Sequence, residues 1–184
     1  LAKLLDGSIN LTYQVPLLKL DNKQKFRDNN QLTNQKIVLF HPGYGGSSDG
    51  NLTLEGYLKL AKVIRNLPNI QVVWVFGPDD LDAKDKIKGL IPDTDIIYHP
   101  STLLDYCFLI RDSELLISTS TGPMHLAGAL NIKTVSFFGN NLFASSKRWA
   151  TVSETNKQLN IEIDKDYQQD LLKKIIDSAI QKLN

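Results

Sequence analysis

The fold is decided by the stretch IVLFHPG at residues 37–43, an apolar run that ends abruptly in a loop. Four consecutive apolar side chains predict a strand buried on both faces. Further strands and helices alternate along the chain. The predicted strands are 70–76, 95–98, 115–117 and 134–138, and the predicted helices are 54–66, 80–89, 102–112, 123–130 and 167–183. This alternation predicts an α/β fold with a parallel sheet covered by helices on both faces.

The first 35 residues differ from the rest of the chain. A short apolar stretch at 11–20, interrupted by Pro16, is followed at 21–35 by a polar run rich in Asn, Gln and Lys. This pattern predicts the tail of a preceding unit and then a linker in residues 1–35, followed by one domain in residues 36–184. Because the chain begins at Leu1, we expect it to be a fragment of a longer protein.

The composition excludes several classes of protein. The 184 residues include 21 basic and 20 acidic side chains, a net charge of +1 that gives no reason to expect nucleic acid as a partner. Cys107 has no second cysteine to pair with, which fits a reducing compartment. No apolar run reaches the roughly 18 residues that a membrane-spanning helix needs, and no signal peptide is visible.

The strongest candidate for a ligand site is the stretch ISTSTGPMHLA at residues 117–127. A buried strand ends there in hydroxyl side chains and Gly122, and Pro123 is predicted to take the first position of a helix. Unpaired N–H groups and a partial positive charge at a helix start can hold a phosphate. An alternative of similar weight is that Ser120, Thr121 and Gly122 only cap the helix.

Two more loops follow predicted strands at the same edge of the sheet. The glycine-rich stretch HPGYGGSSDG at 41–50 resembles a phosphate loop in composition, but it matches neither a Walker A nor a G-x-G-x-x-G motif, and a flexible surface loop is equally consistent with it. In FGPDD at 76–80, a carboxylate could accept hydrogen bonds from a ribose diol. Taken alone, an Asp that caps the next helix is the stronger interpretation.

Other chemistries have no support in the sequence. The three histidines, at 41, 99 and 125, lack the spacing of metal ligands, and a single cysteine cannot form a thiolate cluster. No G-x-S-x-G motif is present, so hydrolase chemistry is not indicated. We therefore expect neither a metal nor a cofactor.

The combination of HPG at 41–43, STGPMHLA at 120–127 and TVSFFG at 134–139 resembles glycosyltransferase family 9, the heptosyltransferases of lipopolysaccharide core synthesis. The resemblance covers residues 36–149. It implies one Rossmann-like half of a two-domain GT-B fold, the half that binds the nucleotide-sugar donor, which is ADP-heptose or another nucleotide sugar. Transfer in this family inverts the anomeric centre. The amino-terminal domain binds the acceptor and supplies the catalytic carboxylate, so no catalytic residue is expected in this chain.

The resemblance also implies roles for individual residues in donor binding. They lie at the phosphates (Gly43, Tyr44), the ribose (Asp79), the adenine (Ser101, Thr102) and the diphosphate with its flanking positions (Ser120, Thr121, Gly122, Met124, His125). Two departures concern the donor. Ser120 stands where the family often has Asp, and the first loop, at 48–51, lacks the basic residue that would help to neutralise a diphosphate.

Two other functions stay open. The missing basic residue favours a non-catalytic module that binds a nucleotide or phosphate. A protein-interaction domain could use the apolar stripe of the last helix, although such stripes more commonly face a domain's own core. If the family function holds, the acceptor is a lipid-linked glycan bound through the other domain. The protein is then expected in the cytoplasm at the inner face of the cytoplasmic membrane, in peripheral association with it.

Overall fold

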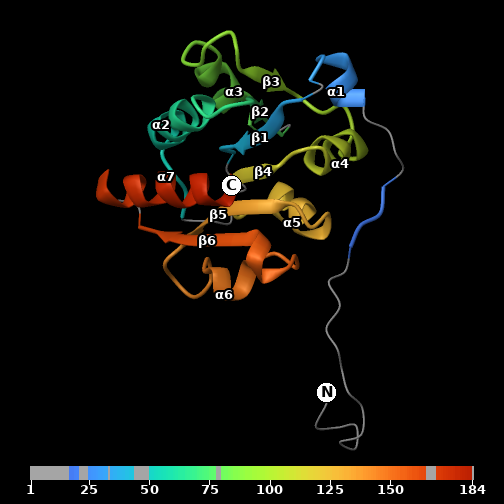
Figure 1. Cartoon of the computed structure of the whole chain (residues 1–184). Helices are drawn as coiled ribbons and strands as arrows, with labels where there is room; N and C mark the ends of the chain where they lie inside the picture. The colour runs from blue at the N-terminus through green and yellow to red at the C-terminus, as the bar shows by residue number, and fades with distance from the viewer. Residues whose placement is uncertain are drawn as a thin grey trace, which may run out of the picture.

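The computed structural model describes residues 17–20, 25–32, 34–43, 50–77, 80–164 and 169–183. Within these residues, six strands form one parallel sheet in the order β3-β2-β1-β4-β5-β6 (Figure 1). The strands are β1 Lys36–His41, β2 Ile70–Val75, β3 Ile96–Tyr98, β4 Leu115–Thr119, β5 Lys133–Gly139 and β6 Gln158–Ile163. The chain builds outward from β1 to β3, returns beside β1 as β4, and then builds outward on the other side. The strand order therefore reverses between β1 and β4.

Helices cover both faces of the sheet. They are α1 Lys25–Asn29, α2 Leu54–Arg65, α3 Leu81–Lys88, α4 Leu103–Arg111, α5 Gly122–Ala129, α6 Ser146–Trp149 and α7 Gln169–Leu183, with a 3-10 turn at Thr155–Lys157. Figure 1 shows α2 and α7 on one side of the sheet, and α1, α4 and α5 on the other. The predicted Rossmann-like arrangement, a parallel sheet between two helical layers, is confirmed.

The two layers follow from the alternation of side chains along each strand. In β1, Val38 and Phe40 join one buried cluster with residues of α2 and α7. Their neighbours Ile37 and Leu39 join a second buried cluster on the opposite face, together with residues of α4 and α5. All four side chains are completely buried. Full burial of such a side chain contributes about 1.5–3 kcal/mol, so the uninterrupted apolar runs account for the central position of these strands.

Four elements were not among those predicted from the sequence: α1, β6, the short helix α6 and the 3-10 turn. Strand β6 pairs with β5 along its whole length, and its Leu159 and Ile161 pack against the core. Helix α1 lies inside the polar run predicted as a linker. Phe26 and Leu32 are each only 5% exposed and belong to a core cluster. Arg27 of the same segment donates to the carbonyl of Asp112 at 2.7 Å, which ties the segment to the end of α4. The domain boundary at residue 35 stays a prediction.

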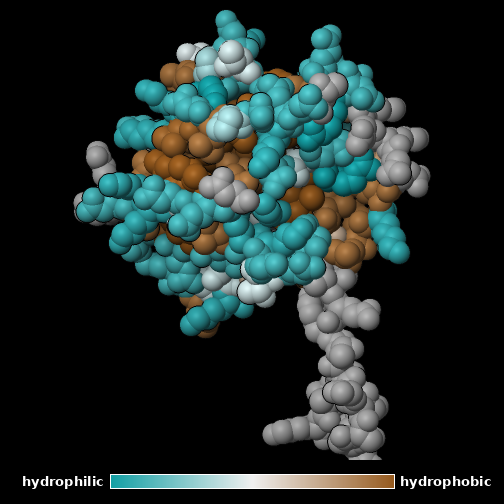
Figure 2. Space-filling view, viewed as in Figure 1, coloured by the Kyte–Doolittle hydropathy of each residue, from teal (hydrophilic) through white to brown (hydrophobic). Residues whose placement is uncertain are grey.

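Within the part of the chain that the structure describes, none of the helices is both long enough and apolar enough to span a membrane. Figure 2 shows mainly hydrophilic residues on the face viewed, with hydrophobic surface confined to patches between them.

Candidate functional site

The loops that follow β1 and β4 leave the sheet side by side. His41 at the end of β1 is the register partner of Ser118 near the end of β4. Both strands run in the same direction, so both loops emerge at the carboxyl edge, at the point where the strand order reverses. Open parallel sheets bind their ligands in the crevice at this point. Two stretches that are nearly eighty residues apart in the sequence are thus brought to one place.

Helix α5 begins at this point with an open start. Its N-cap residue, Thr121, has extended backbone angles but makes no side-chain cap, and its hydroxyl donates instead to the carbonyl of Thr119 at 3.3 Å. The N–H groups of Thr121 and Gly122 have no hydrogen-bond partner in the described part of the chain. The space that a side chain at Gly122 would occupy is empty. The alternative in which Thr121 serves only to cap the helix is therefore wrong for its side chain.

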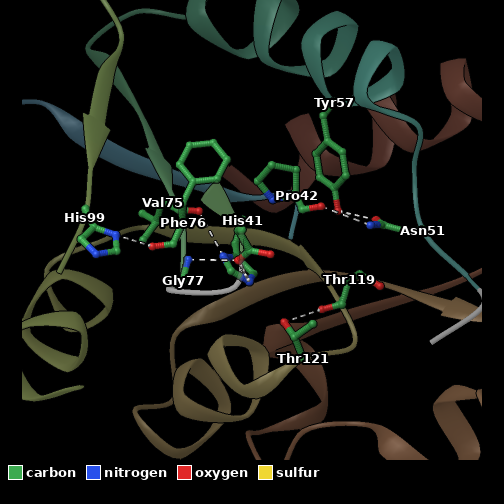
Figure 3. Close-up of polar contacts among 11 residues, drawn as sticks. His41, Pro42, Asn51, Tyr57, Val75, Phe76, Gly77, His99, Thr119 and Thr121 are labelled. Atoms are coloured by element: carbon green, nitrogen blue, oxygen red, sulfur yellow. Dashed lines mark hydrogen bonds and ion pairs between the residues drawn. The ribbon is translucent and has the colours of Figure 1, made fainter. Parts of the chain in front are cut away.

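The loop after β1 is anchored at both of its ends (Figure 3). Asn51 donates through Nδ2 to the carbonyl of Pro42 at 3.3 Å, and the Tyr57 hydroxyl donates to Asn51 Oδ1 at 2.7 Å. Thr119 of β4 donates to the carbonyl of Gly50 at 2.9 Å. A Cβ atom at Gly50 would lie 2.0–2.1 Å from the backbone at the end of β5, so only glycine fits. The residues that close the loop, Gly50 and Asn51, form its second stem. This stem therefore crosses the end of β4, and Gly50 reaches β5.

Asp80 lies beside Gly43, the first predicted phosphate contact. Although Asp80 is the N-cap residue of α3, its carboxylate does not cap that helix. It accepts from the backbone N–H of Gly77 at 3.0 Å and lies against Gly43, where it would overlap any side chain. Its side chain is only 11% exposed. The cap interpretation is thus wrong for the Asp80 side chain, while Asp79, the predicted ribose ligand, and Tyr44 lie outside the described residues.

His41 is a buried group at the end of β1. Its Nδ1 lies 3.1 Å from the carbonyl of Val75, so Nδ1 carries the hydrogen, and Nε2 lies 3.9 Å from the Asp80 carboxylate. Burial lowers the pKa of His41 despite the opposing effect of Asp80. The ring also lies 6.4 Å from that of Tyr106, whose hydroxyl is buried without a partner among the described residues and whose pKa burial raises. Tyr106 was not predicted from the sequence, because its position beside His41 depends on packing between α4 and the sheet.

The remaining predicted residues of α5 take different positions around its first turn. His125 is exposed, and partial desolvation lowers the pKa of its imidazole. Ser120 is 9% exposed, and its N–H donates to the carbonyl of Phe137 at 3.0 Å. The side chain of Met124 is completely buried, so it does not face the open side of the helix start. The contacts of these residues with a donor remain predictions.

The two predicted adenine contacts lie farther along the sheet edge. Ser101 and Thr102 follow β3, which is separated from β1 by β2. Thr102 accepts from the N–H of Asp105 at 3.0 Å as the cap of α4, and the Ser101 hydroxyl donates to the Asp105 carboxylate. His99 ties this segment to the end of β2 through a 3.1 Å contact of Nδ1 with the carbonyl of Phe76 (Figure 3). These residues share the carboxyl edge with the open start of α5 but make no hydrogen bond to it.

The described residues contain no group of three or more His, Cys, Asp or Glu side chains arranged to hold a metal ion.

Known proteins with similar structures have this architecture over about half of their length. One is Escherichia coli ADP-heptose lps heptosyltransferase II, which matches with a TM-score of 0.73 at 21% identity over 91% of this chain and 53% of its own. Another is E. coli heptosyltransferase WaaC with ADP, with a TM-score of 0.64 at 13% identity over 79% of this chain and 44% of its own. These likenesses agree with the predicted fold, one Rossmann-like half of a GT-B arrangement.

Sequence comparisons identify the family. A Haemophilus influenzae protein, whose name gives only the general class glycosyltransferase, is 30% identical over 68% of this chain and 37% of its own length. Lipooligosaccharide heptosyltransferase 2 of Campylobacter jejuni is 25% identical over 86% of this chain and 50% of its own length, so the chain spans half or less of these relatives. The model of glycosyltransferase family 9 (heptosyltransferase) matches residues 2–175. The chain therefore belongs to glycosyltransferase family 9.

Proposed function

We propose that this chain holds the nucleotide-sugar donor of an inverting, heptosyltransferase-like enzyme that builds lipopolysaccharide or a related glycan. The observation that carries the proposal is the uncapped start of α5 at the reversal of strand order. Among the described residues the N–H groups of Thr121 and Gly122 have no hydrogen-bond partner, and the space that a side chain at Gly122 would occupy is open. A helix start with these properties is suited to a phosphate.

The names of the relatives support the choice of donor and pathway. Solved structures of E. coli heptosyltransferase WaaC are described with ADP and with ADP-2-deoxy-2-fluoro heptose. Matched sequences include a lipooligosaccharide heptosyltransferase. We infer the same class of donor, a nucleoside diphosphate sugar, for this chain, and a lipid-linked glycan as acceptor bound outside the described residues. That acceptor would bring the protein to the inner face of the cytoplasmic membrane.

The proposed reaction asks the site to stabilise a departing diphosphate. An acceptor oxygen forms a bond to the anomeric carbon, the bond from that carbon to the diphosphate oxygen breaks, and its electron pair leaves with the diphosphate. The acceptor proton passes to a carboxylate base that we place in the amino-terminal domain of the family arrangement. Negative charge grows on the leaving group, and in this proposal the N–H groups of Thr121 and Gly122 donate hydrogen bonds to it. Loss of one such donor lowers the rate by about 100-fold in well-studied cases.

The anchored loop after β1 supports the same arrangement. Its second stem is held by the Thr119 hydroxyl and by the close approach of Gly50 to β5. Donor groups that are fixed before the ligand arrives lose less conformational freedom on binding and reaction. The fixed stems therefore favour a ligand held between the two loops.

A second candidate, a nucleotide-binding module without catalysis, is favoured by one observation. The Asp80 carboxylate lies against Gly43 and would repel a diphosphate there. Joining the chain to the acceptor-binding domain of a relative and assaying sugar transfer separates the candidates. Transfer supports the enzyme, whereas intact nucleotide binding without any transfer supports the module.

Calorimetry with ADP and UDP tests the proposal directly. We expect one of the two to bind the 184-residue chain, and to bind more tightly than its own nucleoside because the diphosphate contacts α5. Failure of both to bind at millimolar concentration contradicts the proposed site. Equal affinities for nucleoside and nucleoside diphosphate would contradict the role given to the start of α5.

A further inference from the structure

Positive charge is distributed unevenly at the carboxyl edge of the sheet. The segments that follow β1, β2, β3 and β4, at 42–53, 76–80, 99–102 and 120–121, contain no Lys or Arg. The free N–H groups of α5 offer only the partial charge of a helix start, which corresponds to about half an elementary charge. A nucleoside diphosphate carries more negative charge than that. The segment after β5, by contrast, contains both Lys147 and Arg148.

Arg148 is held by two aromatic rings. Its guanidinium carbon lies 5.0 Å from the centre of the Trp149 ring and 5.6 Å from that of Phe143. Both distances lie within the range of a cation–π interaction. The rings are themselves joined, because Trp149 Nε1 donates to the carbonyl of Phe143 at 2.7 Å. Arg148 is exposed and forms no ion pair with the carboxylates of the described residues, so its donors are available to an anion.

This aromatic cluster is attached to α5. The Trp149 ring lies 6.4 Å from the ring of His125, in the first turn of α5. One turn farther along that helix, Thr151 packs so closely over Gly128 that a Cβ atom there would lie 2.4 Å from it. These two contacts hold the segment from α6 to Thr151 against α5. The contact nearer the start of α5, between Trp149 and His125, involves one of the two rings that pack against Arg148.

We propose that Arg148 is a binding residue for the donor diphosphate, supplying from the segment after β5 the positive charge that the loops after β1 to β4 lack. The inference rests on the proposed function. Arginine suits this role because its planar guanidinium can donate two parallel hydrogen bonds to phosphate oxygens. The two rings restrict the side chain before the ligand arrives, which lowers the entropy lost on binding.

The test compares Arg148→Gln with Lys147→Gln, which removes the same charge one residue away without touching the rings. Calorimetry with whichever of ADP and UDP binds the 184-residue chain, and with the corresponding nucleoside, is run at one ionic strength. We expect Arg148→Gln to weaken binding of the nucleoside diphosphate by about tenfold, as for loss of a hydrogen bond to a charged group. Nucleoside affinity should not change, Lys147→Gln should have less than about a twofold effect, and Arg148→Lys should retain part of the affinity.

Three outcomes overturn the inference while leaving the proposed function intact. Each applies when the unmodified chain binds the diphosphate. The first is that Arg148→Gln leaves the affinity for the diphosphate unchanged, and the second is that Arg148→Gln and Lys147→Gln weaken diphosphate binding equally. The third is that Arg148→Gln weakens binding of the nucleoside as much as binding of the nucleoside diphosphate. Failure of the unmodified chain to bind ADP or UDP overturns the proposed function together with the role of Arg148. Circular dichroism before each titration checks that the variants fold as the unmodified chain does.

Discussion

The four helices that follow β1 to β4 begin in two different ways. Helices α2 and α4 start at Thr53 and Thr102, whose hydroxyls accept from the backbone N–H three residues later at 3.1 and 3.0 Å. Helices α3 and α5 start at Asp80 and Thr121, and neither side chain caps its helix. Threonine thus closes two helix starts and leaves a third open, so the residue type alone does not decide whether a start is capped.

The two uncapped starts use their side chains elsewhere. The Asp80 carboxylate accepts from Gly77 and lies against Gly43, and the Thr121 hydroxyl donates back to Thr119. An N-cap contributes about 1 kcal/mol, so an uncapped helix forgoes stability that its sequence could provide. Natural proteins break such local rules mainly at functional sites. The comparison therefore singles out α5, where the uncapped start also has free N–H groups and open space.

The largest effect is expected from a carboxylate placed at the open start. Gly122→Asp should weaken binding of the nucleoside diphosphate by about 100-fold, because like charges brought together cost several kcal/mol. Stability should hold or rise by up to about 1 kcal/mol, since an acidic group favours a helix N-terminus. Calorimetry and urea denaturation measure the two quantities on one preparation.

Leu103 provides the matched control for this change. It is the first residue of the capped helix α4, as Gly122 is of α5, and it is 68% exposed. Leu103→Asp introduces the same carboxylate at the same helical position, and we expect less than a threefold effect on diphosphate binding. Similar losses in both variants would mean that the difference between capped and uncapped starts has no bearing on the ligand.

A smaller effect should separate the threonines themselves. Thr53→Ala removes a side-chain cap and should lower the free energy of unfolding by about 1 kcal/mol. Thr121→Ala removes only a long hydrogen bond to Thr119 and should lower it by less than about 0.5 kcal/mol. Urea denaturation of both variants checks the difference. Equal destabilisation would show that Thr121 caps α5 in solution.

The sequence predicted the parts of the fold that depend on local patterns. The run at 37–40 and its counterparts near 72 and 116 are apolar without interruption, and these strands were predicted. Strand β6 was missed because only every second side chain faces the core, although the alternation of Leu159, Ile161 and Ile163 carries that signal. Helix α1 was missed because Phe26 and Leu32 are isolated in a polar run, and only the completed sheet shows what buries them.

The candidate site was predictable to the extent that topology determines it. Strands buried on both faces imply a parallel sheet, which brings Gly43 and Gly122 to one edge. The direction of individual side chains was not predictable: Met124 turns into the core, and Asp80 turns toward Gly43 instead of capping α3. Arg148 was missed because its position depends on contacts of α6 with α5, which no local pattern encodes.

The smallest effect concerns the other uncapped start and the buried imidazole beside it. His41 has a pKa below its ordinary value of 6.5, chiefly through burial, and the Asp80 carboxylate partly opposes this shift. Above pH 6.5 the stability that comes from neutral His41 is fully present. As the pH falls from there through the folded-state pKa, stability is lost because the unfolded chain binds the proton more readily.

Asp80→Asn should lower the pKa of His41 further, because it removes a negative charge that favours the imidazolium and keeps an oxygen to accept from Gly77. The loss of stability on acidification should then extend to lower pH. Asp82→Asn, which removes an exposed carboxylate two residues later, is the control. NMR titration of the His41 ring, paired with urea denaturation between about pH 7 and pH 5, measures both effects. A pKa that stays the same or rises in Asp80→Asn would show that the Asp80 carboxylate does not act on His41.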